Sequence, residues 1–346
     1  MTLNVAIVGT GIFATIEHLP TFQKSKYFTP YSCYNRTKSK AEIFAAKEPS
    51  ISKIYDSLEE VFEDPKVDLV DALLPVQYNI DVVKLAVKHK KNICFEKPIG
   101  ANLDQAREIV QISKAHPELT IAVAEHCCYY KAIPALKSVI EQIGNVYSFT
   151  YHSTAPFDFS SGYIATGWRQ HPQHIGGYLS DGGVHQLALL TGVLGEIKTV
   201  SAHTKQIRKE SGDVDVLYSL AEMESGVIGT FTYGTAFGNT STSWYFQIMG
   251  DNGSVYVDLT PGHDEKLILK VGGKTADAES FVKEIEIENE YRSTEREFEV
   301  LGESLTSGDK SKIIATPEVA FHHLAIIDAS LKSSKAGGQV TVVEKP

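Results

Sequence analysis

Short apolar runs alternate with amphipathic stretches over residues 1–125 of the chain. The runs with the length and apolar content of buried strands are Leu3–Gly9, Pro30–Asn35, Leu69–Leu74, Asn92–Glu96 and Leu119–Ala124. Two of the intervening stretches, Ile80–His89 and Leu103–Ala115, have the pattern of helices. Strands that alternate with helices are typical of βαβ units, so this part of the chain predicts a parallel sheet covered on both faces.

The pattern changes beyond residue 125, where the apolar runs lengthen and alternate with polar residues. The expected strands are Val146–Ser153, Ile197–Ile207, Val216–Met223, Val227–Thr235, Trp244–Met249, Ser254–Asp258, Lys266–Val271 and Phe281–Glu288. They predict a large open, mostly antiparallel sheet. Thr316 and Pro317 form a good helix start, for a helix that ends near Ser333. We therefore expect a doubly wound α/β domain over residues 1–125 and an α+β domain over residues 126–346.

Composition narrows the class of protein. A chain of 346 residues exceeds the usual limit of a single core, which agrees with two domains. Its net charge of -10 disfavours nucleic acid as a partner, and no apolar run is long enough to span a membrane. The N-terminus has no features of a secretory signal. The four cysteines lack C-x-x-C spacing, which favours free thiols in a reducing compartment. We expect a cytoplasmic protein.

A glycine-rich turn follows the first strand directly. The sequence Gly9-Thr10-Gly11-Ile12-Phe13-Ala14 is a G-x-G-x-x-A version of the dinucleotide fingerprint. Gly9 permits the tight turn, Gly11 lets the backbone approach a pyrophosphate, and Ala14 lets the helix pack closely on the strand. The alternative is a glycine turn that binds nothing. Its position between a strand and a helix favours a Rossmann domain that binds a nicotinamide dinucleotide.

The end of the second strand carries basic residues instead of an acidic one. An NAD-selective site usually has a carboxylate here, which accepts hydrogen bonds from the ribose hydroxyls. This chain has Asn35 and Arg36, followed by Lys38 and Lys40. A guanidinium suits a 2′-phosphate, so we expect NADP(H) in preference to NAD(H), with Asn35, Arg36 and Lys40 near that phosphate. The alternative is a solvated basic loop.

Two further segments carry candidate chemistry. Glu96-Lys97-Pro98 ends a predicted sheet strand at the edge where ligands bind, although Lys97 could also be a surface lysine. Asp181 and His185 stand four residues apart, so on a helix they share a face, and neighbouring glycines leave room for a ligand. An ordinary surface pair is one alternative. A metal site with His171 and His174 is another, but it lacks a recognised ligand spacing, so we expect no metal.

Taken in order, these segments and Trp168-Arg169 resemble the glucose-fructose oxidoreductase/inositol dehydrogenase/rhizopine catabolism (Gfo/Idh/MocA) family over nearly the whole chain. The overall sequence pattern is similar to that of fungal NADP-dependent members of this family. The resemblance implies that Lys97 orients the substrate hydroxyl and the nicotinamide, that Asp181 positions the substrate and that His185 is the general acid/base. It also implies a homodimer or homotetramer that forms through the C-terminal sheet.

The same resemblance supplies the remaining site residues. Cofactor contacts are expected from Leu74, Pro75, Asn79, Glu96, Lys97, Trp168 and Arg169, in addition to the residues of the two turns. Substrate contacts are expected from Lys97, Glu125, Arg169, Asp181 and His185. Asn79 replaces a histidine found in many relatives, and the segment Glu125–Tyr130 lacks an arginine often present there. Because of these two differences, the resemblance does not identify the substrate.

The activity that these residues predict is hydride transfer between the nicotinamide and a hydroxyl- or carbonyl-bearing carbon of a small sugar, polyol or related carbonyl compound. The alternative is a non-catalytic NADP(H)-sensing regulator on the same fold. The other histidines, among them His18 and the pair His322-His323, are interpreted as packing or surface residues.

Overall fold

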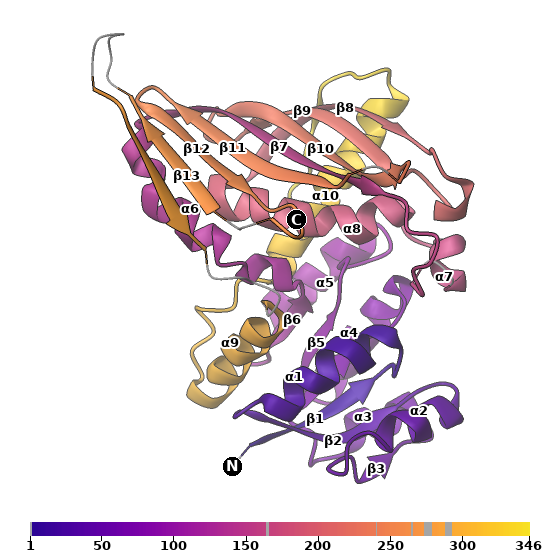
Figure 1. Ribbon diagram of the computed structural model, residues 1–346. Helices are drawn as coiled ribbons and strands as arrows, with labels where there is room; N and C mark the ends of the chain where they lie inside the picture. The colour runs from indigo at the N-terminus through magenta and orange to yellow at the C-terminus, as the bar shows by residue number, and fades with distance from the viewer. Residues whose placement is uncertain (1, 164–165, 240, 264–265, 273–278, 288–292) are drawn as a thin grey trace. The chain divides into compact units, whose positions relative to one another are not determined.

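The computed structural model describes the chain except for residues 1, 164–165, 240, 264–265, 273–278 and 288–292 (Figure 1). It contains two compact units, which we describe in turn. The first comprises residues 1–129 and 292–321 with residue 346, and the second comprises residues 130–291 and 322–345. The sequence pattern placed residues 126–346 in the second domain, whereas residues 292–321 belong to the first unit.

The first unit is built on a parallel sheet, as the pattern predicted. Its described strands lie in the order β3-β2-β1-β4-β5-β6, and every recorded pair is parallel. The strands are β1 (Leu3–Val8), β2 (Phe28–Tyr34), β3 (Lys53–Ile54), β4 (Leu69–Ala72), β5 (Asn92–Glu96) and β6 (Ile121–Ala124). Because β1 pairs with β2 on one side and β4 on the other, the strand order reverses at β1. This is the doubly wound topology of a Rossmann fold.

Helices cover this sheet and close its core. They are α1 (Leu19–Lys24), α2 (Lys38–Ala45), α3 (Leu58–Glu63), α4 (Asn79–Lys88), α5 (Leu103–Ala115) and α9 (Ser293–Ser307). A π-helical turn, η1 (Ala14–His18), precedes α1, and short 3₁₀ turns, η2 (Val76–Tyr78) and η3 (His126–Tyr129), follow β4 and β6.

Helix α9 belongs to this core because of its apolar face. The ring centroid of Phe298 lies 4.6 Å from that of Phe22 and 6.3 Å from that of Phe28, and both contacts are edge-to-face. Phe298 and Leu301 are buried in the same hydrophobic cluster as β1 and β2. The cluster therefore joins the beginning of the chain to a segment near its end.

The second unit contains a mixed sheet that is mostly antiparallel, as predicted. Its described strands lie in the order β14-β13-β12-β11-β7-β10-β9-β8-β15. Only the pair of β7 and β10 is recorded as parallel among these strands. The strands are β7 (Val146–Pro156), β8 (Ile197–Lys205), β9 (Val216–Met223), β10 (Ile228–Phe237), β11 (Ser243–Gly250), β12 (Gly253–Asp258), β13 (Lys266–Val271), β14 (Phe281–Glu286) and β15 (Thr341–Val342).

Helices cover one face of this sheet (Figure 1). They are α6 (Ala132–Ile140), α8 (Gly177–Leu194) and α10 (Pro317–Lys335), while the short α7 (Gly167–Gln170) precedes α8. His322 and His323 of α10 are buried. The backbone N–H of Ile197 donates to His322 Nε2 at 3.0 Å, and His323 Nε2 lies 2.9 Å from Thr191 Oγ1. Their interpretation as packing residues is confirmed.

Two other expectations can be compared with the fold. All four cysteines are free and buried, which confirms the interpretation as thiols. Among the helices in the described part of the chain, none has the length and apolarity needed to cross a membrane.

Replacing Gly302 with alanine tests the packing of α9. A Cβ at this position would lie 2.5 Å from Tyr27 Cβ. Overpacking costs about 1–3 kcal/mol, which outweighs a helix-propensity gain of about 1 kcal/mol. We expect Gly302→Ala to lower the free energy of unfolding in urea denaturation. Arg296→Ala, at an exposed position of the same helix, is the control and should change it by less than about 0.5 kcal/mol. Equal stability of the two variants would contradict this packing.

Candidate active site

The carboxyl ends of the parallel strands bring most of the predicted site residues of the first unit to one edge of the sheet. In doubly wound sheets, ligands bind at this edge, beside the strand where the order reverses. The residues that follow β1, β2, β4, β5 and β6 are Gly9, Thr10, Gly11, Ile12, Phe13, Asn35, Arg36, Leu74, Pro75, Lys97 and Glu125, while Glu96 ends β5 and Lys40 lies in the first turn of α2. Separate segments of the sequence thus meet in one place.

The glycine turn has the geometry that the fingerprint requires. Gly9 has a φ of +93°, and a Cβ there would lie 2.2 Å from Leu73 O, so no other residue fits without strain. Around Gly11 the corresponding Cβ position has no atom within 4 Å. Ala14 is buried at 1 % exposure. The backbone at Gly11 is therefore open to a bound group, while Gly9 and Ala14 pack closely against the protein. This geometry fits a dinucleotide pyrophosphate.

The loop after β2 contains one polar residue that is held by hydrogen bonds and two exposed basic residues. Asn35 Nδ2 donates to Thr10 Oγ1 at 3.0 Å, and Asn35 Oδ1 accepts from the backbone N–H of Thr37 at 2.9 Å. Lys38 Nζ forms an ion pair with Asp56 at 2.6 Å. Arg36 and Lys40 are exposed and have no recorded ion pair within the described residues. Their charges are thus available to an anion in solution.

The turn after β5 is anchored by the side chain of Asn79. Asn79 Nδ2 lies 2.7 Å from Glu96 O and 3.0 Å from Pro98 O, and it donates to both. Asn79 is fully buried, and the peptide bond between Lys97 and Pro98 is cis. The sequence suggested a cofactor contact for Asn79, and it gave no sign of this backbone anchoring.

Behind the same edge lies a buried group of charged side chains that the sequence analysis did not anticipate. His18 Nδ1 is 2.9 Å from Asp71 Oδ2, and His18 Nε2 is 3.9 Å from Glu96 Oε1. Burial acts to lower the pKa of His18, but the charge and hydrogen bond of Asp71 outweigh it and raise the pKa. His18 is therefore a packing residue, as expected, that also carries a buried ion pair.

Glu297 of α9 joins this group from the far end of the chain. It is 3 % exposed, and its Oε1 has no hydrogen bond with the described residues. Burial raises its pKa well above the usual range, and the charges of Glu125, Glu96 and Asp71 raise it further. The carboxyl group at 297 is therefore favoured in its neutral form.

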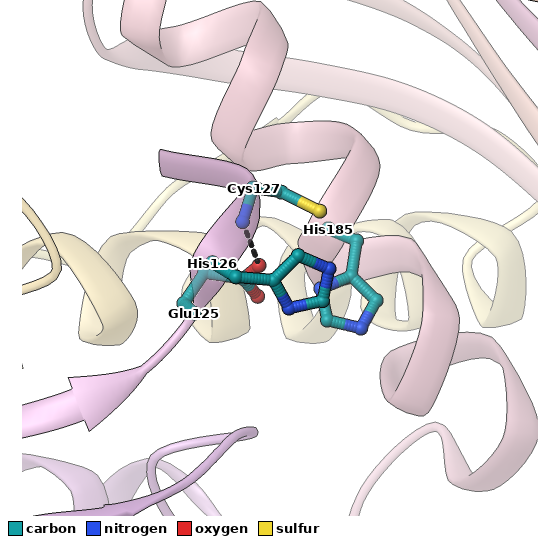
Figure 2. Close-up of side chains that lie close together, drawn as sticks. All are labelled: Glu125, His126, Cys127 and His185. Atoms are coloured by element: carbon teal, nitrogen blue, oxygen red, sulfur yellow. Dashed lines mark hydrogen bonds between the residues drawn. The ribbon is translucent and has the colours of Figure 1, made fainter. Parts of the chain in front are cut away.

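The turn after β6 carries Glu125 and contacts the glycine turn through His126. The backbone N–H of Cys127 donates to Glu125 Oε1 at 3.2 Å, which Figure 2 shows as a dashed line. The rings of His126 and Phe13 stack with centroids 6.4 Å apart. Burial raises the pKa of the Cys128 thiol well above its usual value, and the charge of Glu125 adds to this effect. That thiol therefore stays protonated.

In the second unit, α8 carries two of the predicted catalytic residues. Asp181 and His185 lie four residues apart on this helix and are both partly exposed, so they share one face. Arg169 of α7 forms an ion pair with Asp181, with Nε 2.7 Å from Oδ2. Both side chains of the pair are mostly buried, at 17 % and 15 % exposure. Arg169 and Asp181 were predicted separately as site residues, and in the structure an ion pair joins them directly.

The glycines that follow Asp181 allow close helix packing and do not leave space for a ligand. They were interpreted as space for a ligand, but a Cβ at Gly182 would lie 1.8 Å from Tyr233 Oη. At Gly183 it would lie 3.3 Å from Ile327 Cδ1. These glycines let α8 approach β10 and α10 closely, so the ligand-space interpretation is wrong for them.

The remaining predicted residues near α8 are His171 and His174, considered as metal ligands, and Trp168, expected to contact the cofactor. His174 Nε2 lies 3.2 Å from Gly177 O, and within the described chain no group of close metal-ligating atoms includes His171 or His174. The geometry does not favour a metal site there. The backbone of Trp168 lies in α7, but its side chain is outside the described part of the structure.

Comparison with known proteins identifies the family. The model of the oxidoreductase family NAD-binding Rossmann fold matches residues 3–124, and that of the C-terminal alpha/beta domain matches residues 137–342. The chain belongs to the Gfo/Idh/MocA oxidoreductase family. It is therefore an NAD(P)-dependent oxidoreductase with a nucleotide-binding Rossmann fold.

Individual relatives cover most of the chain. An uncharacterized protein of Saccharomyces cerevisiae is 46% identical over 99% of both chains. D-apiose dehydrogenase of Rhizobium rhizogenes is 24% identical over 75% of this chain and 79% of its own. The crystal structure of an oxidoreductase from Thermotoga maritima matches with a TM-score of 0.87 and 30% identity over 99% of both chains.

The raised pKa of Glu297 gives the stability a specific pH dependence. Its neutral form is favoured in the folded state, so its contribution is complete below the unfolded pKa of about 4.3 and is lost as pH rises through the folded pKa. Glutamine is neutral at every pH. We expect Glu297→Gln to become more stable relative to the wild type between about pH 4 and pH 8, as measured by denaturant unfolding.

Glu299, on the same helix, is the matched control because its pKa is lowered, first by Arg296. Its contribution is present above the unfolded pKa and is lost as pH falls. Glu299→Gln should therefore lose stability relative to the wild type as pH rises. The same trend in both variants would contradict the assignment.

Proposed function

We propose that this oxidoreductase uses NADP(H) and transfers hydride to or from the hydroxyl- or carbonyl-bearing carbon of a small sugar, polyol or related carbonyl compound. The observation that carries the cofactor choice is the exposed Arg36 after β2, which lacks a recorded protein partner among the described residues. The name of the D-apiose dehydrogenase relative supports a sugar-type substrate.

The loop after β2 supports the NADP(H) preference by its charges. A carboxylate would be repelled by a 2′-phosphate, and this loop has the amide of Asn35 in that place. Asn35 is tied to Thr10 of the glycine turn, so the loop is held close to the expected pyrophosphate position. The guanidinium of Arg36 can donate two parallel hydrogen bonds to a phosphate, and Lys40 adds a second positive charge.

The proposed roles of the remaining residues follow from their chemistry. The bound nicotinamide supplies the position that accepts or donates hydride. Lys97 donates toward the substrate oxygen and stabilises negative charge that develops on it. His185 removes the hydroxyl proton during oxidation and returns it during reduction. Asp181, whose carboxylate is oriented by Arg169, holds a second hydroxyl of the substrate.

The cofactor proposal can be tested with Arg36→Ala. Loss of charge-assisted hydrogen bonds worth about 1.5–3 kcal/mol should raise the Kd for NADPH by about tenfold to a hundredfold. The Kd for NADH, which has no 2′-phosphate, should remain nearly unchanged. Fluorescence titration of the reduced nucleotides measures both. The control is Lys38→Ala, because Lys38 is paired with Asp56. Equal weakening of the two nucleotides by Arg36→Ala would refute the phosphate contact.

The catalytic roles can be tested with Lys97→Ala and His185→Ala. We expect each to lower kcat by about 10²–10⁴-fold while NADPH still binds, since general acid/base catalysis contributes about that much. Wild type is first screened against sugars, polyols and carbonyl compounds by nicotinamide absorbance. Lys84→Ala, at an exposed lysine of α4, is the control. Full turnover in either variant would refute the catalytic role of the residue that was replaced. Tight NADPH binding without turnover of any compound would favour the regulator instead.

A further inference from the structure

We propose that Asn79 is a positioning residue for Lys97: its side-chain amide holds the backbone on both sides of that lysine. This inference rests on the proposed function, in which Lys97 acts on the substrate oxygen. It assigns to Asn79 a role through the protein backbone instead of a contact with cofactor or substrate.

The hydrogen bonds of Asn79 bracket Lys97. Its Nδ2 donates to the carbonyl oxygen of Glu96 at 2.7 Å and to that of Pro98 at 3.0 Å. The carbonyl oxygen of Ile99 lies 3.5 Å from the same nitrogen. An amide NH₂ has two hydrogens, and the two short bonds account for both. The residues immediately before and after Lys97 are thus tied to one nitrogen atom.

The remaining polar atom of Asn79 also faces the protein interior. Its Oδ1 is buried and has no hydrogen bond with the described residues. The whole side chain is 0 % exposed. A ligand at the edge of the sheet would therefore not reach a polar atom of Asn79 in this conformation. The conformation fits a residue that shapes the turn and not one that touches a ligand.

The bonds of Asn79 act on a segment that has left the sheet. Lys97 follows the last residue of β5, beyond the ladder of hydrogen bonds with β4 and β6. Further along the chain, the backbone N–H of Ala101 donates to Gln105 Oε1 at 3.1 Å. Asn79, at the start of α4, supplies fixation between these two points. Since a lysine has four rotatable side-chain bonds, a fixed Cα limits where its ammonium can reach.

The chain offers a matched control at the other end of β5. Asn92 Nδ2 donates to Asp68 O at 3.1 Å, and Asn92 Oδ1 accepts from the backbone N–H of Thr120 at 2.9 Å. Asn92 therefore also ties backbone segments together through its amide. It stands at the amino end of the strand, away from the ligand-binding edge. Removing it tests the general cost of losing such an anchor.

The experiment compares Asn79→Leu, Asn79→His and Asn92→Leu with the wild type. Leucine has the same branched shape with no donor, whereas histidine keeps a ring N–H. We expect Asn79→Leu to lower kcat by about tenfold to a hundredfold, because misplacement by about 1 Å can cost about 10²-fold. The KM for substrate and the Kd for NADPH should change much less. Asn79→His should recover part of the lost kcat, and Asn92→Leu should keep the wild-type kcat. Asn79→Ala replaces the leucine variant if that one does not fold.

A second readout does not depend on turnover. Trace acetylation of lysines, quantified by mass spectrometry, reports the accessibility of Lys97 relative to the exposed Lys84. We expect the ratio to rise in Asn79→Leu and to stay at the wild-type value in Asn92→Leu. If the wild type turns over no compound, the proposed function fails, and this ratio still decides the role of Asn79. Wild-type kcat and labelling in Asn79→Leu, or equal losses of kcat in Asn79→Leu and Asn92→Leu, would overturn the proposal.

Discussion

The pairing of β1 with β2 on one side and β4 on the other is the constraint on which the nucleotide-binding unit depends. Parallel pairing places the carboxyl ends of the strands along one edge, and the reversal of strand order at β1 separates the crossover connections there. Segments that are far apart in the sequence therefore reach the same edge, where Asn35 of the basic loop donates to Thr10 of the glycine turn and the ring of His126 stacks on that of Phe13. The glycine turn, the basic loop, the lysine turn and Glu125 are all positioned in this way.

Below that edge the protein interior contains several ionisable side chains, among them His18, Asp71 and Glu297. A buried ion pair such as that of His18 and Asp71 is costly to form from hydrated groups, and it contributes little net stability. Its geometry, however, restricts the neighbouring segments, because a misplaced partner would leave an uncompensated buried charge. Glu297 avoids that cost by being favoured as a neutral acid. The polar interior thus specifies how the first helix, the lysine turn and α9 fit together.

Sequence patterns were sufficient for the parts of the structure that repeat regularly. Hydrophobic periodicity located the main strands of both sheets, and β5, β9, β13 and α5 match the expected bounds at both ends. The fingerprint located the glycine turn because only glycine allows its backbone conformation. Strand β3 was missed because two residues are too few to show alternation. The purpose of Gly182 was misread, since a missing Cβ does not reveal whether a ligand or Tyr233 fills the space.

The buried charges could be recognised only in part. Asp71 stands in an otherwise apolar strand, which is a local signal for a buried partner. Glu297 gives no such signal, because a glutamate in an amphipathic helix is normally assigned to its solvent face. Asn79 could be selected by position, but its attachment to the backbone on both sides of Lys97 depends on how α4 packs beside β5. Such long-range contacts are not encoded in local spacing.

The inclusion of residues 292–321 in the first unit has a consequence for the order of folding during synthesis. The segment that completes the hydrophobic cluster around Phe22 and Phe28 leaves the ribosome only after strands β7 to β14 of the large sheet have been translated. Part of the apolar surface of the nascent Rossmann unit therefore stays exposed while most of the second unit is being synthesised. A fragment cut after the sixth parallel strand would keep that exposed surface permanently.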